Sequence, residues 1–248
     1  RPLAGSARVW RPLMHDFFYI LVPRYLPRLL EGAVVTIELS IVSMIIATIL
    51  GLVVALGRMG RSRLLRLFLN GYVELFRDIP LIVQLLVIYF SLPSIGISLP
   101  AFWAGVLGLS LNLGAYMSEM FRASIMSIET GQREAGLSIG MSQATTYRRI
   151  ILPQAFRVAL PTMGGYFIAL LKDCSLVSFI AVNELLRQGS MIIATTFKSM
   201  EIYLLVAVIY FVMSFIASRL VRLVEWWLTP AYLRTPSLFA RARDGVRP

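Results

Sequence analysis

Residues 39–57 form an unbroken run without a charged side chain, and this run limits the chain to few kinds of fold. A helix needs about 20 apolar residues to cross the hydrocarbon core of a bilayer. The whole chain is 58% hydrophobic and only 15% charged, whereas soluble domains carry about 25% charged residues. The sequence therefore excludes an ordinary water-soluble globule and a disordered tail, and it predicts an integral membrane protein.

Further apolar stretches predict an all-α protein that crosses the membrane about five times. The uncharged stretch 79–118 is long enough for two crossings, and its segment 92–100 contains the prolines and glycine of a turn between them. The expected spans are 39–57, 79–92 with a helical run from Leu64 before it, 101–120, 158–182 with an interruption at Lys172-Asp173, and 202–218. An odd number of crossings places the two termini on opposite sides.

The basic residues predict the orientation of these spans. The net charge is +11, and arginines concentrate after the first span, between the third and fourth, and after the fifth. Cytoplasmic loops carry the excess of basic residues, so we expect the N-terminus outside and the C-terminus in the cytoplasm. Arginines before residue 29 run against this assignment. Because the basic residues lie between apolar runs and not on a polar domain, nucleic acid is excluded as a partner.

The chain is expected to have three parts. Residues 1–31 form an external or interfacial N-terminal segment, in which 16–31 is amphipathic, and no secretory signal peptide is evident. Residues 32–228 form the transmembrane domain, and residues 229–248 form a cytoplasmic tail. Trp226 and Trp227 are expected to anchor the last helix at the inner interface.

No catalytic or cofactor-binding pattern is present in the sequence. There is no G-x-G fingerprint, and neither lysine follows a glycine, so a phosphate-binding P-loop is absent. The single cysteine, Cys174, excludes an internal disulfide, and the single histidine, His15, argues against a catalytic triad and a zinc site. We expect neither catalysis nor a metal in this chain, and Cys174 is expected to be a small buried residue.

The polar insertion between the third and fourth spans predicts a compact projection. Gln132 to Ile139 is expected to form a short helix that packs through Leu137 and Ile139. Gly140 permits the bend that ends it, and Ser142 caps a second short helix, 143–151, which Pro153 limits. Two short helices at an angle in a cytoplasmic loop suit docking into a groove on a soluble partner.

This insertion resembles the cytoplasmic signature of bacterial ABC-importer permeases, in which Glu-Ala-Ala is followed after three residues by Gly and later by Ile-x-Leu-Pro. The matching positions are Glu134, Ala135, Gly136, Gly140, Ile150 and Leu152-Pro153. Gly136 replaces an alanine, which is expected to cost up to ~1 kcal/mol of helix stability. Stretches that resemble the polar amino acid permeases (for histidine, glutamate, glutamine, arginine and opines) begin at Tyr72, Gly114, Leu152 and Leu170. The resemblance covers about residues 28–228.

The resemblance implies the fold of a type I ABC importer permease, with coupling helices at about 131–152. Arg133, Glu134, Ala135, Gly136 and Gly140 would contact an ATPase subunit, which binds the ATP and Mg, so this chain has no cofactor of its own. The implied partners are a second permease copy or a sister permease, two ATP-binding subunits, an external solute-binding protein and membrane lipid. The implied substrates are polar amino acids or related compounds, such as opines and amino acid derivatives.

Charged residues within or beside the spans need partners, because a charge at the bilayer centre costs roughly 2.5–3.5 kcal/mol. Glu119 and Arg122 are three residues apart on one helix and can pair directly. Partners on other helices are expected for Arg77, Asp78, Lys172 and Asp173. In particular, we expect an ion pair between Arg77 and Asp173. The alternative is that these charges only hold helix ends together and contact no substrate.

The substrate pathway is expected near the middle of the fourth span, at Gly164, Gly165, Tyr166, Lys172 and Asp173. Glycines let a ligand or another helix approach closely, so close helix packing through Gly164 and Gly165 is an equal alternative. The resembling family commonly has Asn-Glu where this chain has Gly165-Tyr166. That difference argues against a simple cationic amino acid, or places the pocket in a sister permease. A secondary transporter, a channel and a membrane scaffold or sensor remain as other classes.

Overall fold

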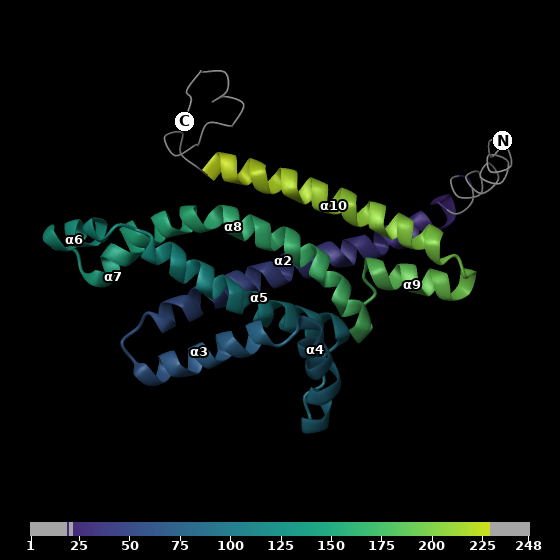
Figure 1. Ribbon diagram of the computed structural model, residues 1–248, viewed down its shortest axis with the longest axis horizontal. Coiled ribbons are helices and arrows are strands. Elements are labelled where there is room, and N and C mark those ends of the chain that lie inside the picture. The colour runs from purple at the N-terminus through teal and green to yellow at the C-terminus, as the bar shows by residue number, and fades with distance from the viewer. Residues whose placement is uncertain (1–18, 20–21, 229–248) are drawn as a thin grey trace, which may run out of the picture.

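The computed structural model describes Tyr19 and residues 22–228, and the regular structure of this part is helical, as predicted (Figure 1). The expected tail 229–248, and the N-terminal segment up to residue 21 apart from Tyr19, lie outside the described residues. The elements are α2 (Val22–Arg58), α3 (Arg63–Asp78), α4 (Leu81–Leu86), η2 (Val87–Ser91), η3 (Leu92–Ile95), α5 (Ala101–Met126), α6 (Thr130–Ser138), α7 (Gln143–Thr146), η4 (Tyr147–Ile151), α8 (Leu152–Asp173), η5 (Cys174–Ile180), α9 (Leu185–Thr196) and α10 (Ser199–Leu228).

The first helix begins at Val22, well before the predicted start of the span at residue 39. Residues 22–31, which were expected to belong to a separate N-terminal segment, are therefore continuous with the first span. Pro27 lies inside this helix, where it cannot donate a hydrogen bond to the carbonyl of Pro23. Leu29 and Ala33 belong to a buried cluster with residues of α9 and α10, and this packing stabilises a helical start that periodicity alone did not show.

The centre of the bundle is the contact between α2 and α5. The buried face of α2 is a row of mostly small side chains at helical spacing, which lets the two backbones approach closely. A Cβ on Gly51 would lie 2.7 Å from Met117 Cβ, and one on Gly114 would lie 2.9 Å from Leu50 Cδ2. The opposite face of α2 exposes isoleucine and valine every fourth residue: Ile37, Ile41, Ile45, Ile49 and Val53. An exposed stripe of this composition is suited to lipid.

Within the described residues, three helical stretches are long and apolar enough to cross a membrane: Val22–Arg58, Gln143–Ile180 and Ser199–Leu228. The pair Arg63–Asp78 and Leu81–Ile95 is a fourth if it is counted as one broken span. The α5 helix has 26 residues, which corresponds to about 39 Å. Neighbouring helices bury most of it. By length and composition, the described residues thus supply three or four crossings, and the predicted number of five stays a prediction.

The second span differs from the prediction. The pass through the bundle is made by α3, and the chain then bends by 107° before Leu81–Ile95, so residues 79–92 do not continue it. Ile79 is extended at the bend, and Pro80 has no N–H to continue the helix. The segment from α4 to η3 runs away from the bundle (Figure 1).

The fourth span begins earlier than predicted, because Pro153 does not end the helix before it. Helix α7 passes through the π-helical turn η4 into α8, so that the helical path runs from Gln143 to Ile180. Pro153 has no backbone N–H to donate. The π turn η4, which precedes it, changes the hydrogen-bond spacing of the helix at this point, so that the helix continues past the proline. The expected interruption at Lys172-Asp173 is a change from α-helix to the tighter 3-10 helix η5, not a break.

Candidate functional site

The short helices α6 and α7 form a projection at one end of the bundle (Figure 1). Helix α6 ends in a left-handed glycine, Gly140, with φ +81°. The N–H of Met141 donates to the carbonyl of Gly136 at 3.1 Å, which closes the helix end in the manner of a Schellman motif. Ser142 then caps α7 by accepting the N–H of Thr145 at 3.2 Å. The predicted helix, bend and cap are confirmed, with α6 starting two residues early.

The packing of this projection differs from the prediction. Leu137 and Ile139 do not pack inward: they are 38% and 77% exposed. The inward position is Gly136, which lies against Thr146 and Ile150. Arg133, Glu134 and Ala135 are exposed. The projection therefore presents the charged side chains of Arg133 and Glu134 and the aliphatic side chains of Ala135, Leu137 and Ile139 to its surroundings.

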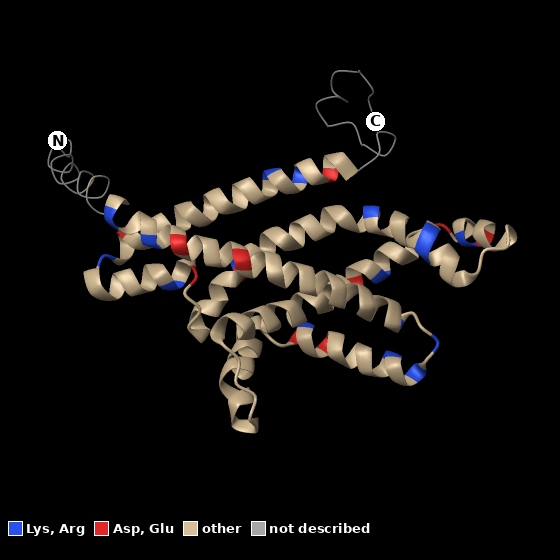
Figure 2. Cartoon of the chain, turned by 180° about the vertical axis from the view of Figure 1, so that it is seen from behind, with Lys and Arg blue, Asp and Glu red and all other residues tan. Residues whose placement is uncertain are grey.

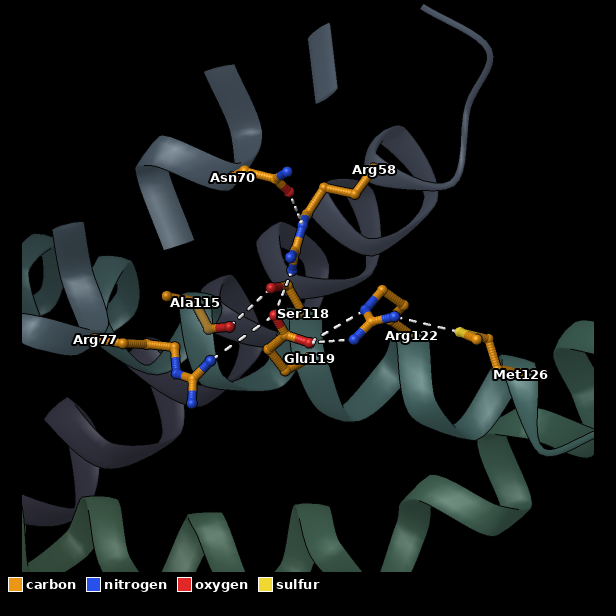
Figure 3. A network of polar contacts seen from close by, with 8 residues as sticks. All are labelled: Arg58, Asn70, Arg77, Ala115, Ser118, Glu119, Arg122 and Met126. Atoms are coloured by element: carbon orange, nitrogen blue, oxygen red, sulfur yellow. Dashed lines mark hydrogen bonds and ion pairs between the residues drawn. The ribbon is translucent and has the colours of Figure 1, made fainter. Parts of the chain in front are cut away.

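A charged cluster joins α2, α3 and α5 around the carboxylate of Glu119 (Figure 3). Arg122 lies 3.0 Å from Oε2, which confirms the predicted pair on α5. Arg58, at the end of α2, lies 2.8 Å from Oε1 and also donates to the Asn70 side chain at 2.7 Å. Arg77 is the third guanidinium, 3.8 Å from Oε1. Arg58 was not predicted as a partner, because a basic residue that directly follows an uncharged span is typical of a loop.

The predicted ion pair between Arg77 and Asp173 is wrong for this structure. Arg77 pairs with Glu119 instead, and its guanidinium lies 5.4 Å from the centre of the Tyr116 ring. No hydrogen bond or ion pair joins the Asp173 carboxylate to any other residue between 22 and 228. Both residues nevertheless line the same cavity.

This cavity has a volume of about 400 Å³ and lies between the α3–α4 bend, α5, α8 and η5. Its polar lining comprises Arg77, Asp78, Asn112, Tyr116, Tyr166 and Asp173. Leucine, isoleucine, proline and alanine side chains form the rest. Of the five residues predicted for the substrate pathway, Tyr166 and Asp173 face this space.

The other three predicted pathway residues lie elsewhere. A Cβ on Gly164 would collide with Val221 of α10, so this glycine serves close helix packing, which was the alternative. Gly165 has open space around its Cα. Lys172 is exposed and does not line the cavity.

Two amides that the sequence did not single out hold the bend beside the cavity. The side-chain nitrogen of Gln84 donates to the carbonyls of Phe76 and Ile79 at 2.9 and 2.6 Å. Asn112 donates to the carbonyl of Phe76 at 2.8 Å and to the Gln84 side-chain oxygen at 3.3 Å. Together they satisfy carbonyls that lose their helical partners where α3 ends. The available sequence signal for Gln84 and Asn112 was that each is a polar residue within an apolar run.

A second set of buried polar side chains involves α9 and α10. Glu184 is fully buried, caps α9 and accepts the hydroxyl of Tyr210 at 2.8 Å. Cys174 is buried as predicted, and its sulfur lies 3.2 Å from the Ser40 hydroxyl. In the part of the chain that the structure describes, no three metal-ligating side chains gather.

The helical passes and the projecting helix pair define an integral membrane transport subunit. The chain belongs to the family described as binding-protein-dependent transport system inner membrane component, which matches residues 47–229. Its relatives include the L-cystine transport system permease protein TcyB of Bacillus subtilis, 41% identical over 89% of this chain and 92% of the relative. The nopaline transport system permease protein NocM of Agrobacterium fabrum is 36% identical over 85% and 91%, and the glutamine transport system permease protein GlnP of Escherichia coli is 37% identical over 81% and 92%.

Solved structures agree with this assignment. A crystal structure of an amino acid ABC transporter with histidines superposes with a TM-score of 0.78 at 38% identity, and it covers 84% of this chain and 97% of that one. The MetNI methionine ABC transporter has a similar fold, with a TM-score of 0.70 at 20% identity over 82% of this chain and 97% of that one. The chain is thus a permease subunit with the type I ABC importer fold. It is a transport component and not an enzyme, and the secondary transporter and scaffold alternatives do not hold.

Proposed function

We propose that this chain forms one half of a translocation pathway for polar amino acids or related compounds. Relatives named for cystine, nopaline and glutamine transport support this substrate class. A second permease copy or a sister permease would complete the pathway. Two ATP-binding subunits would hold the ATP and Mg, and an external solute-binding protein would deliver the substrate.

The observation that carries the proposal is the α6–α7 projection. It stands at the end of two long passes, α5 and α8, and offers Arg133, Glu134, Leu137 and Ile139 to a partner. A short helix with exposed aliphatic and charged side chains fits a groove on a soluble subunit. Because the helical path continues from α7 to η5, a push on the projection would reach the cavity-lining residues of α8.

We propose the orientation with the N-terminus outside and this projection in the cytoplasm. The α2–α3 connection, the α6–α7 projection and the C-terminal end of α10 lie at one end of the bundle (Figures 1 and 2). These are the three arginine-rich regions that the positive-inside rule assigns to the cytoplasm. The start of α2 and helix α9 lie at the other end.

The test is Glu134→Arg in the importer reconstituted with its ATP-binding subunits and binding protein. We expect membrane insertion to be unchanged and ATP-driven uptake to fall at least about tenfold, because a charge reversal opposes the partner's basic groups. Glu31→Arg is the matched control, since Glu31 is exposed on α2 far from the projection. Normal uptake by Glu134→Arg would contradict the coupling role.

A further inference from the structure

Arg77 and Asp173 lie on different walls of the cavity and do not satisfy each other. Arg77 is at the end of α3, and Asp173 is at the end of α8. Both line the space of about 400 Å³. A cation and an anion that share a cavity without pairing leave room for a ligand that carries both charges.

Arg77 is held loosely and can turn to a ligand at little cost. Its distance of 3.8 Å to Glu119 Oε1 is longer than the 2.8 Å of Arg58 to the same oxygen. Arg122 occupies Oε2 at 3.0 Å. The Glu119 carboxylate therefore remains paired by two guanidinium groups when Arg77 leaves. The Tyr116 ring, 5.4 Å away, and the Tyr116 hydroxyl, which donates to the Arg77 carbonyl at 3.3 Å, keep Arg77 at the cavity wall.

Asp173 has no hydrogen bond or ion pair with another residue between 22 and 228, and only the charge of the adjacent Lys172 acts on it. Its neighbour Lys172 does not line the cavity, because consecutive helical residues point about 100° apart. The other acidic residue of the lining, Asp78, comes from the α3 wall beside Arg77. A carboxylate within a membrane domain is stabilised by a cationic partner, and Asp173 is placed to receive one from a ligand.

We infer that Arg77 and Asp173 form a two-point clamp for a zwitterionic amino acid: the guanidinium binds the ligand carboxylate, and Asp173 binds the ammonium group. The inference rests on the proposed function and assigns that function's ligand contacts. Arginine suits the first role because its planar fork matches a carboxylate. The volume fits a small solute. One basic and two acidic side chains in the lining disfavour a ligand with net negative charge.

The test begins with the importer in proteoliposomes. Uptake of a mixture of the twenty common L-amino acids and L-cystine, measured by mass spectrometry, identifies the transported compounds. Each of these compounds, its decarboxylated amine and its deaminated acid are then bound to the permease–ATPase complex in nanodiscs without binding protein. The variants are Arg77→Gln, Asp173→Asn, the charge-conserving Arg77→Lys and Asp173→Glu, and Lys198→Gln as control, because Lys198 is exposed and does not line the cavity.

In the wild type, the amine and the acid are expected to bind at least about tenfold more weakly than the amino acid, because each lacks one charged contact. Arg77→Gln should weaken the amino acid and the acid but leave the amine unchanged. Asp173→Asn should weaken the amino acid and the amine but leave the acid unchanged. Charge-conserving variants should recover part of the affinity, and Lys198→Gln should behave as wild type. This pattern separates ligand contact from loss of fold, which weakens all three probes equally.

Several results would overturn the clamp. These are unchanged amino acid affinity in both neutral variants, equal weakening of all three probes, or no binding to a wild-type complex that transports. In each case the uptake of amino acids by the wild type would leave the proposed function standing. Failure of the wild-type importer to take up any compound of the mixture would instead overturn the proposed function, and the clamp with it.

Discussion

The Cα of Gly136 lies directly against the buried side chain of Thr146, so that a Cβ on Gly136 would be 2.8 Å from Thr146 Cγ2. The same Cβ would lie 3.1 Å from Ile150 Cδ1. The glycine that departs from the alanine of the importer signature is therefore matched by a threonine on the facing helix. Its expected cost in helix propensity is offset by the close contact between α6 and α7.

Gly136→Ala is expected to loosen the projection, although alanine is the better helix former. The propensity gain is about 1 kcal/mol, whereas overpacking a tight contact costs about 1–3 kcal/mol. Amide hydrogen exchange over residues 130–146, measured by mass spectrometry, should become faster. Gly136→Ala with Thr146→Ser removes the colliding methyl group and should restore slow exchange. A single variant as protected as the wild type would refute the contact.

Glu119→Gln is expected to lower the stability of the importer. The neutral amide leaves Arg58, Arg77 and Arg122 close together without their shared anion. Removing one partner of a partly buried ion cluster costs on the order of 2 kcal/mol, which corresponds to a Tm lowered by roughly 5 °C. Glu38→Gln, an exposed position on α2, is the matched control. Equal thermal unfolding of the two variants would show that the cluster contributes nothing.

The sequence predicted the all-helical class and the projection, because both depend on local signals. Uncharged runs define spans, and Gly140 and Ser142 have the conformational and capping properties that a bend between two short helices needs. Local signals failed where packing or register decides. Pro153 was expected to end a helix, but the helix continues through a π turn that precedes the proline and accommodates its missing N–H. The start at Val22 depends on contacts with α9 and α10, which no pattern near residue 22 shows.

The sequence predicted which charged and polar residues belong to the site better than it predicted which of them pair with each other. Glu119 and Arg122 were paired correctly because their spacing on one helix fixes their proximity. Pairing across helices depends on the packing of α3 against α5, which places Arg77 beside Glu119. Once Arg77 contacts Glu119, Asp173 is left without its expected partner. Tyr166 and Asp173 were correctly placed at a cavity, because they lie seven residues apart on one helical face.

Replacement of Gln84 is expected to weaken the bend beside the cavity. Gln84→Leu loses two hydrogen bonds to carbonyls, at about 1 kcal/mol each. Gln84→Glu should also lower the stability, because an ionised carboxylate cannot donate to the same two carbonyls. Thermal unfolding should show a lower Tm for both variants, and a Tm equal to that of the wild type would contradict the role of Gln84 at the bend.

The proposed orientation predicts which engineered thiols a membrane-impermeant maleimide reaches. Ser94→Cys in η3 should react in intact cells, whereas Arg61→Cys in the α2–α3 connection should react only after permeabilisation. Both positions are exposed, and the native Cys174 is fully buried, so the wild type gives the background. The opposite labelling pattern would place the projection outside the cell and contradict its role in coupling.

The central claim is that this permease moves solute only when a separate ATP-binding subunit acts on the α6–α7 projection. The most direct measurement is amino acid uptake into proteoliposomes that contain the permease with or without its co-purified ATP-binding subunits. The account predicts uptake that requires both the subunits and ATP. Concentrative uptake by the permease alone would contradict it.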